Sequence, residues 1–236
     1  MASIATKAGG DRPKRRRCAP ELRREAILAA ARAVFLECGY AGATVDAVVE
    51  RAGGSKATVY AMFGNKEGLF AALIAELAER FAEAVRALGP GSSPAESLRS
   101  LGRTYLELVV SEEALAIFRL VAGESGRLPQ LGDIFYRGGP RTGLSLFTEV
   151  FRDWMARGLI AGRDPESLAS HFQGALRGDL HLRALLNPTR APTKKEIAAH
   201  VEVVVCAFLS GCTPDTRSAG TSGPLAVAAQ FPGGEC

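Results

Sequence analysis

The residues best suited to specific chemistry lie together between Thr44 and Lys66. Directly after a pair of glycines, the segment from Ser55 to Tyr60 reads S-K-A-T-V-Y. The Lys56 ammonium can donate to O6 and N7 of guanine, and the Ala57 methyl can contact a thymine methyl. Hydroxyls such as those of Thr58 and Tyr60 can reach phosphate oxygens. These residue types predict a surface that contacts duplex DNA, with Ser55, Lys56, Ala57 and Thr58 nearest the base edges.

Three predicted helices would hold this segment at the surface. The first runs from about Pro20 to Cys38 and ends before Gly39, a typical residue after a helix C-terminus. Thr44 can cap a second helix that runs through about Ala52, and Ser55 can cap a third that ends near Phe63. Two short helices joined by a tight turn and braced by a longer helix are typical of the DNA-binding helix-turn-helix. We therefore expect residues 19–66 to form a DNA-binding domain.

The same residues also allow a purely structural interpretation. Thr44 and Ser55 can serve only as helix caps, Lys56 and Lys66 only as solvated charges, and Tyr60 only as a packing residue. However, Thr44 and Lys66 both stand at helix N-termini, where free N–H groups and the helix dipole favour phosphate oxygens. Taken together, the residues favour DNA binding.

The charge distribution agrees with a nucleic-acid partner at the N-terminal end. Residues 1–66 hold 12 Lys and Arg against 6 Asp and Glu, a net charge of +6. The remaining residues hold 17 against 19, a net charge of −2. Residues 1–18 have no apolar periodicity and are predicted to be a disordered basic arm. The run Lys14–Arg17 either adds salt-sensitive DNA affinity or is a solvated tail, and the sequence leaves both open.

Two stretches of sequence resemble the N-terminal domain of the tetracycline-repressor (TetR) family. Arg24 to Thr44 reads R-E-A-I-L-A-A-A-R-A-V-F-L-E-C-G-Y-A-G-A-T, and Ala52 to Leu69 reads A-G-G-S-K-A-T-V-Y-A-M-F-G-N-K-E-G-L. The resemblance covers about residues 20–70. It implies that Lys56 and Ala57 face bases, and that Thr44, Thr58, Tyr60 and Lys66 hold phosphates.

Two positions depart from this family's usual pattern. Gly54 stands where the family often has valine, and Met62 stands where it often has a polar aromatic residue or histidine. We expect Gly54 to loosen packing at the turn and Met62 to remove one phosphate contact.

The rest of the chain predicts a larger helical bundle, so the fold class is all-α. A fourth helix is expected over Asn65–Ala87, and the stretch Glu124–Pro140 is expected to hold a short helix between turns. Residues 67–210 would form this second domain, and residues 211–236, rich in Gly, Pro, Ser and Thr, a disordered tail. Further helices are predicted at about Pro94–Val110, Glu112–Ala122, Arg141–Arg157, Pro165–Leu186 and Thr193–Leu209.

A long apolar bundle with a few inward polar groups suits a ligand cavity. The segments from Phe118 to Val121, Phe135 to Pro140 and Leu176 to Asp179 resemble the C-terminal domain of the AefR-like branch of the TetR family, which implies regulation by an inducer. The alternative is that these aromatic residues form ordinary core. The candidate lining residues are Tyr105, Phe118, Arg119, Phe135, Tyr136, Trp154 and Phe172, with Arg177 and His181 as polar ends.

A homodimer is expected because one helix-turn-helix contacts only half of a symmetric operator. The last two helices present Leu168, Phe172, Leu176 and Leu180, and Ile197, Val201, Val204 and Phe208. These faces form either an intersubunit four-helix bundle or the core of one subunit. The predicted function is a homodimeric repressor released from operator DNA by an unidentified small molecule. The ligand would change the separation of the two recognition helices, and the fourth helix would transmit this change. The alternative is a ligand-independent dimeric DNA-binding protein, either an activator or an architectural protein.

Other classes of protein fit the sequence poorly. No apolar run is long enough to span a membrane, and five cysteines without a C-x-x-C pair favour a reducing cytoplasm. His171 and His181 are ten positions apart, a poor spacing for metal ligands on one helix. No nucleophile–base pair or phosphate loop is apparent. We therefore expect a cytoplasmic, non-enzymatic protein without cofactor or metal.

Overall fold

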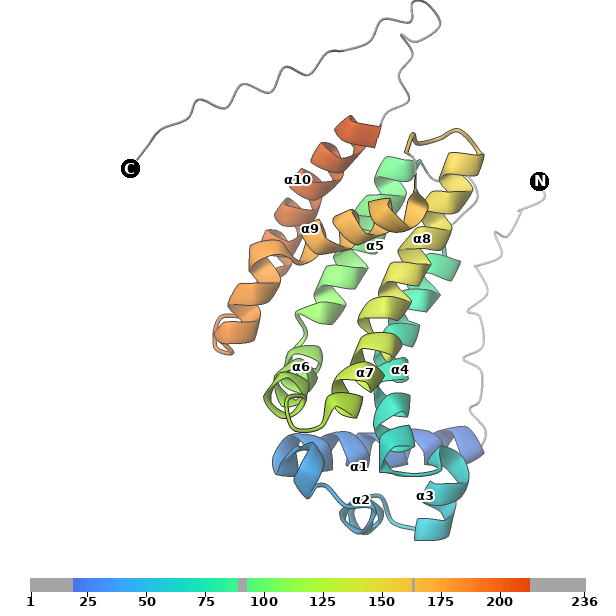
Figure 1. Cartoon of the computed structure of the whole chain (residues 1–236), viewed down its shortest axis with the longest axis vertical. Helices are drawn as coiled ribbons and strands as arrows, with labels where there is room; N and C mark the ends of the chain where they lie inside the picture. The colour runs from blue at the N-terminus through green and yellow to red at the C-terminus, as the bar shows by residue number, and fades with distance from the viewer. Residues whose placement is uncertain (1–18, 89–92, 163, 213–236) are drawn as a thin grey trace, which may run out of the picture.

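A computed structural model describes residues 19–88, 93–162 and 164–212, and within these ranges every regular element is a helix (Figure 1). The predicted all-α class is confirmed. In chain order the helices are α1 (Ala19–Gly42), α2 (Val45–Ala52), α3 (Lys56–Phe63), α4 (Lys66–Arg86), α5 (Pro94–Val109), α6 (Glu112–Glu124), α7 (Pro129–Gly138), α8 (Pro140–Ala156), α9 (Pro165–Leu186) and α10 (Lys194–Cys212).

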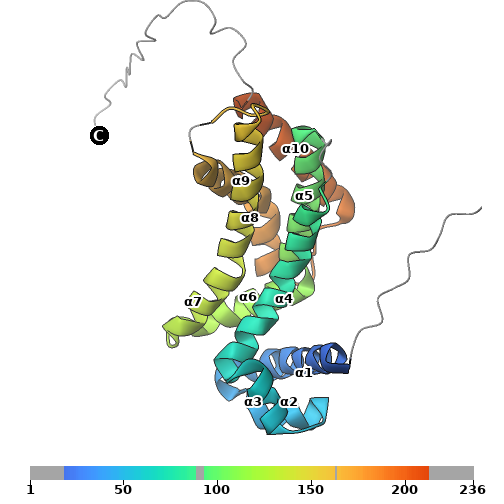
Figure 2. The same cartoon turned by 90° about the vertical axis from the view of Figure 1, so that its right-hand side faces the viewer.

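Helices α1 to α3 form a compact unit at one end of the molecule, below the bundle in Figures 1 and 2. Its helix starts were predicted correctly: Thr44 Oγ1 accepts the N–H of Ala47 at 3.2 Å, and Ser55 Oγ accepts that of Thr58 at 3.2 Å. The chain bends at Gly39, where φ is 70°, a conformation that glycine adopts at little cost. These local signals fix the turns that place α3 on the surface.

The core of this unit continues into the long helix α4. Phe35 and Tyr40 of α1 pack against Phe70 of α4, with ring centroids 5.2 to 5.6 Å apart in the three pairs. Ile117 and Val121 of α6 belong to the same buried cluster. Helices α1 to α3 are therefore packed against the bundle through both α4 and α6.

The bundle has a second core made by α4, α5, α8, α9 and α10. Phe147 and Phe151 of α8 and Phe172 of α9 are fully buried at its centre. Arg99 of α5 pairs with Glu202 of α10 through two hydrogen bonds of 2.7 Å. Helix α9 contains a kink that the sequence pattern did not predict: Gly178 has φ 40° and ψ −144°.

The apolar faces predicted for the last two helices are buried within one subunit. Phe172, Leu176, Ile197 and Val201 are each at most 4% exposed and belong to the bundle core. Between the two interpretations left open by the sequence, the structure therefore favours burial within one subunit for these residues. Other apolar side chains of the same helices face outward, namely Leu182 (53% exposed), Leu186 (74%) and Val203 (69%).

Several sequence predictions fall outside the described residues. They concern the basic arm with Lys14–Arg17 and most of the predicted tail. Helix α10 runs to Cys212, three residues beyond its predicted end. None of the described helices is long and apolar enough to cross a membrane.

Candidate nucleic-acid interface and ligand cavity

Helix α3 presents its first residues to solvent at the end of the molecule farthest from α10 (Figure 1). Val59 anchors the helix in the core at 1% exposure, whereas Ser55, Lys56, Ala57 and Tyr60 are exposed and Thr58 is half-buried. The Ser55 and Thr58 hydroxyls lie 3.0 Å apart and form a hydrogen bond. The structure thus brings the predicted base-contacting residues together on one exposed helix start.

The charge of Lys56 is partly compensated by a neighbouring acid. Its Nζ forms an ion pair with Asp46 of α2, and this hydrogen bond raises the pKa of the lysine above its ordinary value. Both side chains are more than half exposed. An exposed pair of this kind is weak, so the ammonium can exchange Asp46 for a base or phosphate at small cost.

The turn between α2 and α3 explains the unusual glycine at position 54. Arg23 of α1 donates to the carbonyl oxygens of Ala52, at 2.9 Å, and Gly53. A Cβ on Gly54 would overlap this guanidinium, and the residue has φ 84°. Arg23 therefore occupies the space that a side chain would need. The sequence predicted looser packing at this turn, whereas the hydrogen bonds from Arg23 connect the turn to α1.

The two residues predicted at helix N-termini have different environments. Thr44 is exposed beside the start of α2, where its position allows a phosphate contact. The Lys66 ammonium instead donates to the carbonyl oxygens of Tyr40, Ala41 and Ala43 at 2.9, 3.4 and 3.1 Å. It also lies 4.7 Å from the Tyr40 ring centroid. Its donors are engaged at the end of α1, which favours a structural role.

Met62, the other departure from the family pattern, is 37% exposed on α3. Its thioether offers no N–H or O–H donor to a phosphate. The loss of one phosphate contact at this position stays a prediction.

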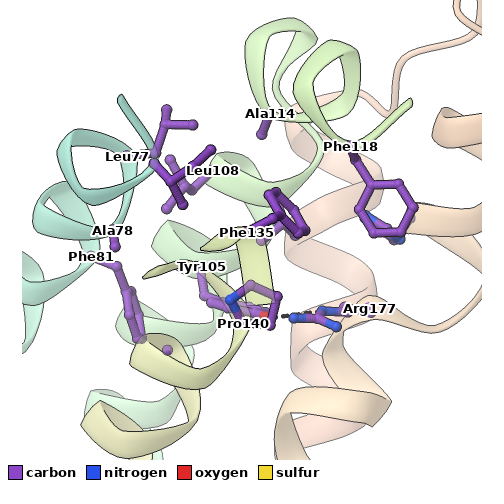
Figure 3. A pocket seen from close by; sticks show the side chains of 15 residues that line it. Leu77, Ala78, Phe81, Tyr105, Leu108, Ala114, Phe118, Phe135, Pro140 and Arg177 are labelled. Carbon is purple, nitrogen blue, oxygen red and sulfur yellow. Dashed lines mark hydrogen bonds between the residues drawn. The ribbon is translucent and has the colours of Figure 1, made fainter. Parts of the chain in front are cut away.

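A cavity opens in the bundle between residues of α4, α5, α6, α8 and α9, with Phe135 of α7 in its wall (Figure 3). The empty space between its walls, together with the open solvent at its mouth, is about 700 Å³. Five predicted lining residues contribute to its wall: Tyr105, Phe118, Phe135, Arg177 and His181. The sequence did not predict that α4 lines the cavity. Another part of the wall is formed by its residues Ile74, Leu77, Ala78 and Phe81. Their helical spacing was visible, but it does not distinguish a cavity wall from a filled core.

Four other predicted pocket residues lie outside the cavity lining. Trp154 (5% exposed) and Phe172 (fully buried) pack in the bundle core, and Tyr136 is 56% exposed. Arg119 donates to the carbonyl oxygens of Ala184 and Leu185, both at 2.8 Å, at the end of α9. Its guanidinium therefore satisfies the last turn of a helix.

Arg177, Tyr105 and His181 supply the polar groups of the cavity. Arg177 Nε donates to the Tyr105 hydroxyl at 2.8 Å (Figure 3). Burial raises the pKa of Tyr105 although Arg177 opposes that shift. Burial also lowers the pKa of His181, and the Arg177 charge lowers it further. Both side chains are therefore uncharged near neutral pH.

Helix α6 connects the cavity to the helix-turn-helix unit. Ala114 and Phe118 line the cavity, whereas Glu124 at the other end of the helix accepts the backbone N–H groups of Tyr40, at 2.7 Å, and Ala41, at 3.0 Å. Glu113 also forms an ion pair with Arg32 of α1. One helix therefore contacts both the cavity and α1. Among the described residues, no group of three or more side chains suits a metal ion.

The sequence matches two family profiles. Residues 27–73 match the profile of bacterial regulatory proteins of the tetR family, and residues 96–211 match that of the C-terminal domain of AefR-like transcriptional repressors. The first match covers the helix-turn-helix and the beginning of α4, and the second covers most of the bundle.

Solved structures resemble the chain over nearly their whole length. A protein from Mesorhizobium loti assigned to the TetR family is 28% identical with a TM-score of 0.72, and the match covers 84% of this chain and 100% of that one. The flavonoid-responsive regulator FrrA is 31% identical with a TM-score of 0.69, covering 83% of this chain and 99% of FrrA.

A curated relative resembles only part of the chain. The transcriptional repressor AcnR of Corynebacterium glutamicum is 44% identical over 78 residues, which are 33% of this chain and 38% of AcnR. The chain thus matches little more than a third of that repressor.

Proposed function

The chain belongs to the TetR family of bacterial transcriptional regulators, and from this premise we propose that it is a homodimeric repressor. In this proposal α3 binds operator DNA in the major groove, and a small molecule bound in the bundle cavity releases the protein from its operator. The naming of the partly matched relative AcnR as a repressor supports repression over activation.

One observation carries the DNA-binding part of the proposal: Lys56 and Ala57 are exposed at the start of a helix that the buried Val59 anchors in the core. An anchored helix whose start exposes donor and methyl groups suits direct readout of base edges. Thr44, Thr58 and Tyr60 offer hydroxyls for phosphate oxygens, and Ser55 stands with Lys56 and Ala57 at the helix start. Among the predicted DNA-contacting residues, Lys66 is the least suited to bind a phosphate, because its ammonium already donates to backbone carbonyl oxygens of the protein.

Selection of bound sequences from random duplex DNA with the full-length protein tests this part. We expect enrichment of a two-fold symmetric sequence whose half-sites are about one helical turn, roughly 34–36 Å, or a multiple of it apart. Recovery of unrelated sequences at physiological salt would refute sequence-specific binding.

Exposed apolar and small residues on α9 and α10 support dimerisation. On α10 the residues Ala199, Val203, Cys206 and Ala207 are exposed and share a face at helical spacing. On α9 the side chains of Leu182 and Leu186 are exposed as well. Such a surface costs free energy in water, and a second copy of the chain would cover it.

The substitution Val203→Asp tests this interface. A carboxylate at the centre of an apolar interface has no partner and should dissociate the dimer. Analytical ultracentrifugation should show a monomer, and affinity for a full operator should fall. The control Arg152→Asp changes another exposed side chain, on α8, and should leave the dimer intact. A dimer that survives Val203→Asp would place the interface elsewhere.

Two helices offer a route from the cavity to the recognition helix. Helix α4 lines the cavity with Leu77 and Phe81 and begins beside α3, and α6 lines it with Phe118 and holds α1 through Glu124. A ligand that favours one placement of these helices would change the separation of the two copies of α3 in a dimer. The ligand must bind the two placements with different affinity for the operator to be released.

The cavity also favours this proposal over a ligand-independent DNA-binding protein, for which a filled bundle would suffice. The relative FrrA is described as flavonoid-responsive, and the Phe81, Phe118 and Phe135 rings of the present cavity suit a flat aromatic guest. Protection of the protein against thermal unfolding by such a guest, together with operator release, would support the switch.

A further inference from the structure

Arg177 gives the cavity one formal positive charge. It is the only permanently charged residue among the side chains that line the cavity, and within the described part of the chain no carboxylate lines it. The described ion pair nearby on α9 joins Arg183 to Asp179 and does not involve Arg177. The half-buried guanidinium lies 5.8 Å from the centroid of the Tyr105 ring, and no acid among the lining residues balances its formal charge.

The hydrogen-bonding neighbours of Arg177 hold it in place without neutralising it. The Tyr105 hydroxyl accepts the Nε–H at 2.8 Å, and the phenol is uncharged. This bond uses one of the five N–H donors of a guanidinium and leaves the others for a second acceptor. His181 lies four positions further along α9, beyond the kink at Gly178, and also lines the cavity. The guanidinium is thus oriented and still has free donors.

The remaining wall is mostly apolar and includes the rings of Phe81, Phe118 and Phe135. The Phe118 and Phe135 rings meet edge to face, with centroids 5.7 Å apart, and Phe118 meets the His181 ring at 5.6 Å. Leu77 and Leu108 lie on the side of the cavity away from Arg177 (Figure 3). The cavity therefore has one cationic end and an apolar remainder.

We propose that the effector of this protein is an organic anion, with a flat apolar body against the phenylalanine wall and one oxyanion group, such as a carboxylate, bound by Arg177. This inference rests on the proposed function, since it specifies the ligand of the same cavity. A guanidinium binds an oxyanion through charge-assisted hydrogen bonds, which are stronger than neutral ones. An uncharged molecule of the same shape would leave the half-buried positive charge without an anionic partner in the cavity.

Two fluorescent probes with the same ring system test the inference: anilinonaphthalene sulfonate, which carries an oxyanion, and N-phenylnaphthylamine, which does not. With full-length protein, we expect the sulfonate to bind more tightly. Arg177→Gln should weaken sulfonate binding about 10- to 100-fold and change binding of the neutral probe less than about threefold. Arg177→Lys should restore part of the affinity, because it keeps the charge without the fork of donors. The matched control Arg152→Gln removes an exposed charge from the same bundle and should change neither affinity.

Variants that fill the cavity show where the probes bind. Ala114→Trp on α6 and Ala78→Phe on α4 should each abolish binding of both probes, and a thermal unfolding midpoint near that of wild type verifies that the variants fold. Equal loss of both probes in Arg177→Gln, or no loss of the sulfonate, would overturn the anion preference and leave a ligand cavity intact. If neither filling variant affects either probe, both the anion preference and the ligand-responsive part of the proposed function are refuted. None of these outcomes bears on the DNA-binding part of the proposed function, which is tested separately by measuring operator binding.

Discussion

The environment of Lys66 leads to a prediction that separates a structural lysine from a phosphate-binding one. Its ammonium donates to three backbone carbonyl oxygens at the end of α1, of which those of Tyr40 and Ala43 belong to partly buried bonds. Lys66→Met keeps the apolar stem of the side chain and removes the donors. The carbonyl groups beyond Gly39 would then lose their side-chain partner.

The magnitude follows from these contacts. A hydrogen bond to a charged group contributes about 1.5–3 kcal/mol. The three bonds share one ammonium and one of them is exposed, so we expect a total loss of about 2–3 kcal/mol rather than the full sum. For a domain of this size, each kcal/mol lowers the unfolding midpoint by about 2–4 °C.

The assay is thermal and urea unfolding of Lys66→Met at fixed protein concentration, because the stability of a dimer depends on concentration. The control Lys56→Met removes an equal charge from an exposed side chain and should change stability by less than about 0.5 kcal/mol. Operator affinity is measured in parallel over a range of salt concentrations. Our reasoning is refuted if Lys66→Met leaves the stability unchanged and reduces the slope of log operator affinity against log salt concentration by about 1. That result would indicate that Lys66 contacts a phosphate.

Three further predictions concern the recognition helix, the link to α6 and the bundle. Lys56→Ala should cost about 1–3 kcal/mol of operator binding and relax the preference at one base pair, as measured with single-base variants of the operator; equal weakening at all positions would instead indicate a phosphate contact. Glu124→Gln should accelerate hydrogen exchange of the Tyr40 amide, because the charged acceptor is lost, and unchanged exchange would show that the contact contributes little. The hydrogen bonds from Arg99 lower the pKa of Glu202 to about 2. The ion pair therefore stabilises the fold fully above pH 4.5, the ordinary pKa of the carboxyl, and this stabilisation is lost as the pH falls toward 2. The difference in thermal midpoint between wild type and Glu202→Gln should therefore shrink over that pH range, and a difference independent of pH would exclude this linkage.

The sequence by itself determined the elements of this protein. The caps Thr44 and Ser55, the break at Gly39 and the helical spacing of apolar residues are local signals, because they depend on neighbours within one or two turns. They were sufficient to predict the all-α fold, the helix-turn-helix and the exposed start of α3. The family resemblance rests on the same short segments.

The tertiary structure decided the partners of individual side chains. The sequence could not show that Lys66 binds the end of α1, that Arg23 fills the space beside Gly54, or that Trp154 and Phe172 lie in the core while Phe118 and Phe135 line a cavity. Apolar residues at helical spacing look alike whether they face a neighbouring helix, a cavity or a second subunit. Only the packing of distant helices distinguishes these environments, since the contacts join residues far apart in the chain.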